Sequence, residues 1–123
     1  GTDVTAFTWG AMTRPTLAAA ETLAGEIDVE VVDLRTLSPL DEGTIVDSFR
    51  KTGRAVVVHE APRTGGLAGE IVATIQEEAL GYQEAPVERV TGFDVPYPPY
   101  ALEDYYLPEP ARIEDGIRDA HDF

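Results

Sequence analysis

The pair His59-Glu60 has the residue types of an acid–base catalyst. In such a catalyst, the acid and the base must reach the same reacting group. The pair follows an apolar, β-rich run, and neighbouring residues of a strand point to opposite faces of a sheet. We therefore predict a structural or interface hydrogen-bonding role for the pair. The other histidine, His121, has no metal-ligand spacing to His59, so a metal site is not indicated.

Arg63 and Thr64, which directly precede two consecutive glycines, are the candidates for holding an anion. Backbone N–H groups at the start of a helix can bind a phosphate or a carboxylate. The sequence has neither of the glycine-rich phosphate-binding motifs, and paired glycines also serve turns and close packing. If the chain is a free-standing anion-binding domain, we expect its site in a crevice of His59, Glu60, Arg63 and Thr64.

Four tyrosines lie in a proline-rich connection near the C-terminus: Tyr97, Tyr100, Tyr105 and Tyr106. Tyrosine and proline lose little conformational entropy on burial, so such a segment suits a rigid contact surface. Two interpretations remain open for it. The segment either wraps the edge of the chain's own sheet or forms a subunit interface.

The composition is that of a globular chain of 123 residues, with 43% hydrophobic and 26% charged residues. No apolar run approaches the roughly 20 residues of a membrane span. Cysteine is absent, which excludes disulfides, thiolate metal sites and cysteine nucleophiles. We expect a cytoplasmic protein, with neither a membrane nor a nucleic acid as its partner.

Charge is the unusual property of the chain. It has 23 Asp and Glu against 9 Lys and Arg, a net charge of −14, and Lys51 is the only lysine. Such a surface repels nucleic acids and anionic lipids. It is either a well-solvated acidic surface or an adaptation to concentrated salt, in which screening removes the self-repulsion. We favour the second interpretation and expect a halophilic source.

Short β-rich runs alternate with helical stretches along the chain. Strands are expected at residues 3–9, 29–34, 55–58 and 87–91. Apolar residues at helical spacing predict the buried helix faces as Leu17, Ala20 and Ala24, then Ile45, Val46 and Phe49, then Leu67, Ile71, Ile75 and Ala79, and last Ile113 and Ile117. Asp41 is the expected N-cap and Gly53 the expected end of the second helix, and Pro110 fits the first turn of the last one.

This alternation predicts a three-layer α/β/α fold with a parallel four-stranded sheet in the order 2-1-3-4. Ligands of such sheets bind at the carboxyl ends of the strands, where the strand order reverses. The segments Trp9–Arg14 and His59–Thr64 would line that crevice.

Several ordered motifs resemble one known family. They are Val32–Asp41 (VDLRTLSPLD), Lys51–Arg54 (KTGR), Val58–Pro62 (VHEAP), Thr64–Gly66 (TGG), Glu70-Ile71, Ala85–Gly92 (APVERVTG) and Tyr106–Pro108 (YLP). Together they resemble the C-terminal domain of the E1 β subunit of 2-oxo acid dehydrogenase complexes, a transketolase C-terminal-like domain. The His-Glu-Ala-Pro and Thr-Gly-Gly motifs are more similar to the branched-chain 2-oxo acid type than to the pyruvate type. The match runs nearly end to end.

The resemblance implies one domain over residues 1–123, as a fragment of a longer β subunit. In the parent enzyme, thiamin diphosphate and Mg²⁺ lie between other domains, so no catalytic, cofactor-binding or metal residue is carried over to this chain. The implied partners are the E1 α subunit and a second β subunit in an α2β2 heterotetramer, and the subunit-binding domain of the E2 acyltransferase. The matching domain of another transketolase-like enzyme is a further alternative.

The resemblance and the charge pattern together suggest where E2 would dock. Acidic groups at the end of the last helix add to the negative pole of the helix dipole, and a basic partner would offset them. We expect Asp119, Asp122 and Phe123 in this docking surface, with the turn containing Tyr82 and Gln83 as a neighbour. The alternative is a frayed acidic tail that only increases the solubility of the chain.

Overall fold

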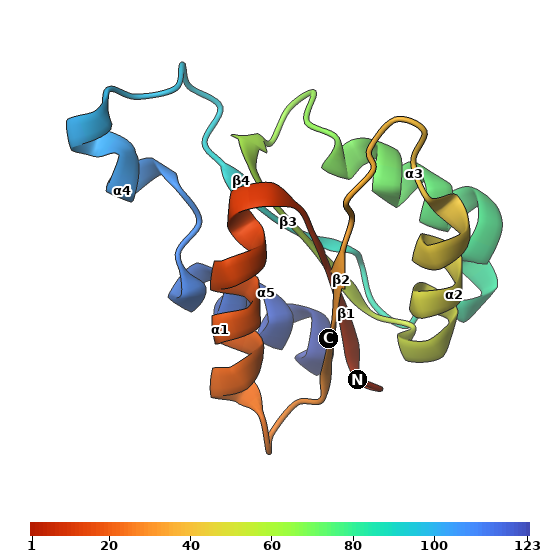
Figure 1. The fold of residues 1–123 in the computed structure, drawn as a ribbon. Helices are drawn as coiled ribbons and strands as arrows, with labels where there is room; N and C mark the ends of the chain where they lie inside the picture. Colours follow the sequence, from red (N-terminus) through yellow and green to blue (C-terminus); the bar gives the residue numbers. More distant parts are fainter.

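The centre of the molecule is a parallel sheet of four strands (Figure 1). The computed structural model describes residues 1–123. The strand order is β2-β1-β3-β4, as predicted. β3 continues four residues beyond the predicted end and includes His59 and Glu60. The strands are β1 (Val4–Thr8), β2 (Val29–Asp33), β3 (Ala55–Pro62) and β4 (Glu88–Gly92).

Helices cover both faces of the sheet, which gives the expected three layers (Figure 1). α1 and α5 pack on one face, and α2 and α3 pack on the other. The helices are α1 (Thr13–Leu23), α2 (Glu42–Thr52), α3 (Ala68–Ala79), the short α4 (Glu103–Tyr106) and α5 (Pro110–Asp122). Single 3-10 turns occupy Gly10–Met12, Leu80–Tyr82 and Tyr100–Leu102. No helix is long and apolar enough to cross a membrane.

The strand β3 supplies side chains to both apolar layers. Val56 and Val58 contribute to the cluster under α1 and α5, whereas Ala55 and Val57 contribute to the cluster under α2 and α3. All four are fully buried. This is why the run is apolar throughout, because a strand covered on both faces has no polar side to present.

The ends of α2 follow the predicted signals. Asp41 caps the N-terminus by accepting a hydrogen bond from the Thr44 backbone N–H at 3.1 Å. Gly53 ends the helix with a φ of +68°. A Cβ there would lie 2.8 Å from the Tyr82 carbonyl oxygen. Only glycine therefore fits both the backbone conformation and the space.

The predicted face of α1 is wrong. The buried residues are Thr16, Ala19 and Leu23, whereas Leu17 is 46% exposed and Ala24 lies beyond the helix. Thr16 can be buried because its hydroxyl donates a hydrogen bond to the Met12 carbonyl at 2.7 Å. With its polar group satisfied inside the helix, a threonine packs like an apolar residue.

The other predicted helix faces are confirmed except at Leu67, which precedes α3 and is half-buried. Ile71, Ile75 and Ala79 of α3 are buried, as are Ile113 and Ile117 of α5. α5 lies close to the sheet at Gly116, where a Cβ would lie 2.5 Å from a methyl group of Val90.

Candidate functional site

His59 lies inside the protein and not on a crevice wall. Its side chain is 1% exposed, and its ring centroid is 5.4 Å from a ring of Trp9. Gly66 packs directly against it, since a Cβ there would lie 2.7 Å from the His59 Cε1 atom. Burial lowers the pKa of His59, against opposing effects of the backbone at Ala61 and His59, and the positive charge of Arg89 adds a smaller lowering effect. The neighbouring Glu60 is exposed, so the two side chains do not meet.

The four residues of the predicted crevice do not share one cavity. Thr64 bonds instead to Asp94, whose carboxylate accepts from the Thr64 backbone N–H at 2.9 Å and from its hydroxyl at 2.5 Å. These hydrogen bonds lower the pKa of Asp94, with a smaller contribution from the charge of Arg63. Arg63 itself points toward a different hollow, at the carboxyl end of β4.

That hollow is a cavity of about 290 Å³ lined by three arginines, Arg63, Arg89 and Arg112. Thr91, Gly92, Phe93 and Asp94 complete its wall. The sequence does not indicate Arg89 and Arg112 as site residues, because they are 23 residues apart, Arg112 lies in none of the motifs, and Arg89 lies in the Ala85–Gly92 motif, which indicates a family and not a site. Only the packing of α5 beside β4 brings them together.

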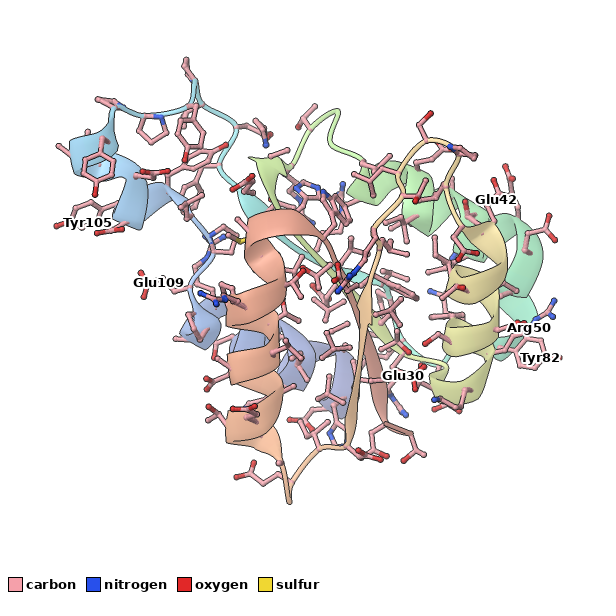
Figure 2. The ribbon with its side chains drawn as sticks, viewed as in Figure 1. Glu30, Glu42, Arg50, Tyr82, Tyr105 and Glu109 are labelled. Atoms are coloured by element: carbon pink, nitrogen blue, oxygen red, sulfur yellow. The ribbon has the colours of Figure 1, made fainter.

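Of the residues expected at the E2-docking surface, Phe123 and Gln83 lie together, whereas the ring of Tyr82 lies against Arg50 of α2. Phe123 is 76% exposed and lines a shallow cavity of about 350 Å³ together with Gln83. Tyr82, in the same turn as Gln83, holds the guanidinium of Arg50 over its ring at 5.4 Å (Figure 2). Asp119 and Asp122 are both exposed. The turn is thus a spatial neighbour of the chain's C-terminal residue, whereas docking itself stays a prediction.

The proline-rich connection projects away from the sheet instead of wrapping its edge (Figure 1). Tyr100 is 91% exposed and Tyr105 is 80% exposed. Figure 2 shows Tyr105 on α4, away from the sheet. Only Tyr106 is buried, and its ring packs edge-on against Phe93 and Tyr97. Tyr106 therefore anchors the segment, and its other tyrosines face outward.

Tyr97 is also fixed at its outer end. Its hydroxyl donates a hydrogen bond to the carboxylate of Glu103, at the start of α4. This bond raises the pKa of Tyr97 to about 12, because the carboxylate disfavours a second negative charge beside it. The segment is therefore held in shape by contacts of its own.

The acidic side chains of this chain do not form a set that fits Mg²⁺, the metal expected beside thiamin diphosphate in the parent enzyme. No group of three or more His, Asp or Glu side chains could hold a metal ion. The only clustered cations are the three arginines, with no carboxylate set beside them for Mg²⁺. We therefore derive no catalytic step from these residues.

Known proteins resemble this chain along nearly its whole length. It is 49% identical over 119 residues to the 3-methyl-2-oxobutanoate dehydrogenase subunit beta of Mycobacterium tuberculosis, covering 95% of this chain and 34% of the relative. It is 44% identical over 124 residues to the pyruvate dehydrogenase E1 component subunit beta of Bacillus subtilis, covering 100% of this chain and 38% of the relative. The chain spans about a third of the length of the curated relatives that it matches.

A solved structure and a family model agree with these sequence matches. A structure described as a split-gene transketolase, inactive beta4 tetramer, superposes with a TM-score of 0.81 at 32% identity. It covers 99% of this chain, which in turn covers 39% of it. The family model described as the transketolase C-terminal domain matches residues 1–113. With this match, the close fold and the E1 β relatives, the chain belongs to the transketolase C-terminal domain family.

Proposed function

We propose that residues 1–123 form a single assembly and partner-docking domain of an E1 β subunit. The parent enzyme would be a thiamin diphosphate-dependent 2-oxo acid dehydrogenase. It oxidatively decarboxylates a 2-oxo acid and transfers the acyl group to lipoyl groups on E2. The β subunits among the relatives support this parent, and the relatives include both branched-chain and pyruvate enzymes.

The observation that carries the assembly role is the projecting aromatic segment, residues 93–105. Its exposed apolar side chains are Phe93, Val95, Tyr97, Tyr100, Leu102 and Tyr105. Large exposed aromatic side chains at one place are typical of protein interfaces, where they become anchors. We infer that the E1 α subunit or the second β subunit covers this segment in an α2β2 heterotetramer.

The assembly role is tested with the complete β subunit co-expressed with its α subunit. The double variant Tyr100→Ser/Tyr105→Ser removes two outward rings without touching the buried anchor Tyr106. We expect the heterotetramer to dissociate at concentrations at least tenfold higher than the wild type, measured by mass photometry. The control Leu80→Ser removes a 59% exposed apolar side chain outside the segment and is expected to leave assembly unchanged. Equal dissociation of the tyrosine variant and the wild type contradicts the role.

The docking role rests on the acidic end of α5. Asp119 and Asp122 are exposed, and His121 contacts only the Asp122 carboxylate, at 2.7 Å. Carboxylates at a helix C-terminus are unfavourable beside the negative pole of the dipole, so a cationic partner would gain from them. We propose that Asp119, Asp122 and Phe123, with Tyr82 and Gln83 beside them, receive a basic E2 subunit-binding domain.

Docking is tested by titrating the intact E1 assembly with its cognate E2 domain at several salt concentrations. Asp119→Asn/Asp122→Asn is expected to weaken binding and to flatten its salt dependence, because fewer charges are screened. Glu42→Gln/Asp47→Asn makes the same charge change on α2, over the other face of the sheet, and is the matched control. An acidic-end variant that binds like this control places docking elsewhere.

We further propose that the cofactor belongs to other parts of the parent enzyme and that the assembly is cytoplasmic. Thiamin diphosphate and Mg²⁺ would bind outside this domain, since its side chains offer no metal cluster. The isolated chain is therefore expected neither to decarboxylate a 2-oxo acid nor to bind the cofactor. Calorimetric binding of thiamin diphosphate that requires Mg²⁺ and is tighter than about 1 mM would contradict this.

A further inference from the structure

The free positive charges of this acidic chain gather at one place. Four of its nine lysine and arginine side chains form ion pairs with carboxylates: Arg35, Lys51, Arg54 and Arg118. Of the remaining five, three line the cavity at the carboxyl end of β4. With 23 acidic residues in the chain, three arginines without a carboxylate partner around one cavity are unexpected.

These arginines are held in place by the backbone of the edge strand β4. Arg63 donates to the Arg89 carbonyl at 3.1 Å, and Arg112 donates to the Thr91 carbonyl at 2.8 Å. The two carbonyls are two residues apart on a strand with a neighbour on one side only. Arg112 also stacks over the ring of Phe93 at 4.8 Å. Two of the three guanidinium groups are therefore positioned by fixed contacts.

Most of the donors of these groups remain available. A guanidinium has five N–H donors, and Arg63 and Arg112 each make one side-chain hydrogen bond. The Nη1 atom of Arg112 is buried and has no hydrogen-bond partner. Arg89 makes no side-chain hydrogen bond or ion pair, although its side chain is half-buried. A buried charged donor without an acceptor, such as the Nη1 of Arg112, is costly, so an acceptor is expected to enter this cavity.

The charge balance indicates the acceptor. Three guanidinium groups and the carboxylate of Asp94 give the cavity a net charge of about +2 when all are ionised. A phosphate group carries nearly two negative charges at pH 7 and offers several oxygens in different directions. A planar carboxylate matches a single arginine fork. We propose that Arg63, Arg89 and Arg112 form a phosphate-binding site, for inorganic phosphate or for the phosphate group of a small molecule.

The three arginines of the site lie outside the assembly and docking surfaces proposed above, although Phe93 and Asp94 of its wall belong to the projecting segment. None of its three arginines belongs to the projecting segment or to the acidic end of α5. It also differs from the crevice predicted from the sequence, with which it shares only Arg63. The variants keep the two tests distinguishable, because Tyr100 and Tyr105 do not line the cavity and Arg63 does not belong to the projecting segment.

The test is calorimetric titration of the complete native polypeptide that carries this sequence, in its natural assembly. The added ligands are potassium phosphate and glycerol 2-phosphate, with potassium chloride and potassium acetate at equal ionic strength as controls. We expect saturable binding of a phosphate species, with no saturable heat from chloride or acetate. Binding of both ligands indicates recognition of the phosphate group, and tighter binding of the ester indicates an organic phosphate.

Two variants that change the charge of the cavity in opposite directions provide a further test. Arg63→Gln changes an exposed side chain and is expected to weaken phosphate binding at least fivefold. Asp94→Asn removes the one carboxylate of the cavity and is expected to tighten binding severalfold. Arg35→Gln, an exposed arginine paired with Asp33, is the control and should leave binding unchanged. The absence of saturable phosphate binding, or equal affinities for Arg63→Gln and Arg35→Gln, overturns the proposal. So does a carboxylate of another subunit seated among the arginines in a crystal structure of the assembly.

Discussion

At the scale of single residues, His59 is a buried polar group between Trp9 and Gly66. Neither of its ring nitrogens makes a hydrogen bond. A charged imidazole would be poorly solvated there, so the folded protein favours the neutral form. The residue that looks most catalytic in the sequence is therefore a packing residue in the structure.

The first prediction concerns the pH dependence of stability at His59. Its folded pKa lies below the ordinary value of 6.5, so the unfolded chain binds the proton first as the pH falls. The free energy of unfolding should therefore fall as the pH drops below about 6.5, and this contribution should be absent in His59→Gln. Urea unfolding between pH 5 and 8 measures the difference. Parallel curves for the two proteins would show that His59 protonates freely when folded.

The second prediction concerns the contact between Gly66 and His59. A Cβ on Gly66 would lie 2.6 Å from the Pro62 carbonyl oxygen, so Gly66→Ala should destabilise the fold by about 1–3 kcal/mol. Gly69 is the matched control, because a Cβ there meets nothing within 4 Å. Gly69→Ala lies in the first turn of α3 and should be neutral or stabilising by up to about 1 kcal/mol. Chemical denaturation compares the two, and equal effects would contradict the close packing.

The arginine cavity shows which kind of site residue is difficult to predict from a sequence. Arg63, Arg89 and Arg112 come from the end of β3, from β4 and from the first turn of α5. Arg63 is predicted as a site residue only because it lies just before two consecutive glycines. Arg112 lies in no motif, and the motif that contains Arg89 indicates the family and not a site. The two arginines meet only because the connection after β4 returns α5 to the sheet. Sites assembled from distant segments need the packing to be known first.

At the scale of elements, local chemistry predicted most of the fold. The strand order followed from alternation and crossover handedness, and the faces of α3 and α5 followed from apolar spacing. The prediction of the buried face of α1 failed because the alanines occupy several sides of the helix and do not define one apolar stripe. Its true face includes Thr16, whose hydroxyl is satisfied by the helix itself. Spacing rules based on apolar residues cannot identify such a position.

The third prediction concerns the N-cap of α2. Asp41 accepts from both the backbone N–H and the hydroxyl of Thr44, and these bonds hold the pKa of Asp41 below 3.8. Stability from a lowered carboxyl pKa is present above pH 4 and is lost as the pH falls through the folded value. Asp41→Ala should therefore lower the melting temperature by on the order of a few degrees at pH 7, and by less at pH 3.

The control for this cap prediction is Asp47→Ala in the same helix. Asp47 is exposed and makes no side-chain hydrogen bond, so its loss should not lower the melting temperature at either pH. Differential scanning calorimetry at both pH values compares the variants. A deficit for Asp41→Ala that does not shrink in acid would mean that the helix is not stabilised by the ionised cap.

At the scale of the whole molecule, net charge dominates. The chain carries a net charge of −14, and only four of its nine lysine and arginine side chains are paired with carboxylates. Like charges that are not paired repel one another over about 10 Å at 0.1 M salt but only about 3 Å at 1 M. We infer that the surface is adapted to concentrated salt.

The fourth prediction is a melting temperature that rises with salt. Between 0.1 and 2 M KCl the increase should be on the order of 5–10 °C, because screening relieves the self-repulsion of the folded state. Neutralising three exposed acids, as Glu21→Gln, Asp47→Asn and Glu77→Gln, should reduce the increase. A flat trend, or the same increase in the neutralised variant, would remove electrostatic repulsion as the cause.

The projecting segment also makes the chain accessible to proteolytic cleavage at one place. Chymotrypsin can reach Tyr100 and Tyr105, which extend from the body, whereas Ile113 and Ile117 beyond them are fully buried against the sheet. A nick in the segment should therefore give two pieces that stay together and coelute on gel filtration, since α5 keeps its place in the core. Separation of the pieces would mean that the covalent link is needed. If the two pieces stay associated, α5 could be added as a separate peptide to a chain that ends before it. Binding of that peptide would then report whether the rest of the domain is folded.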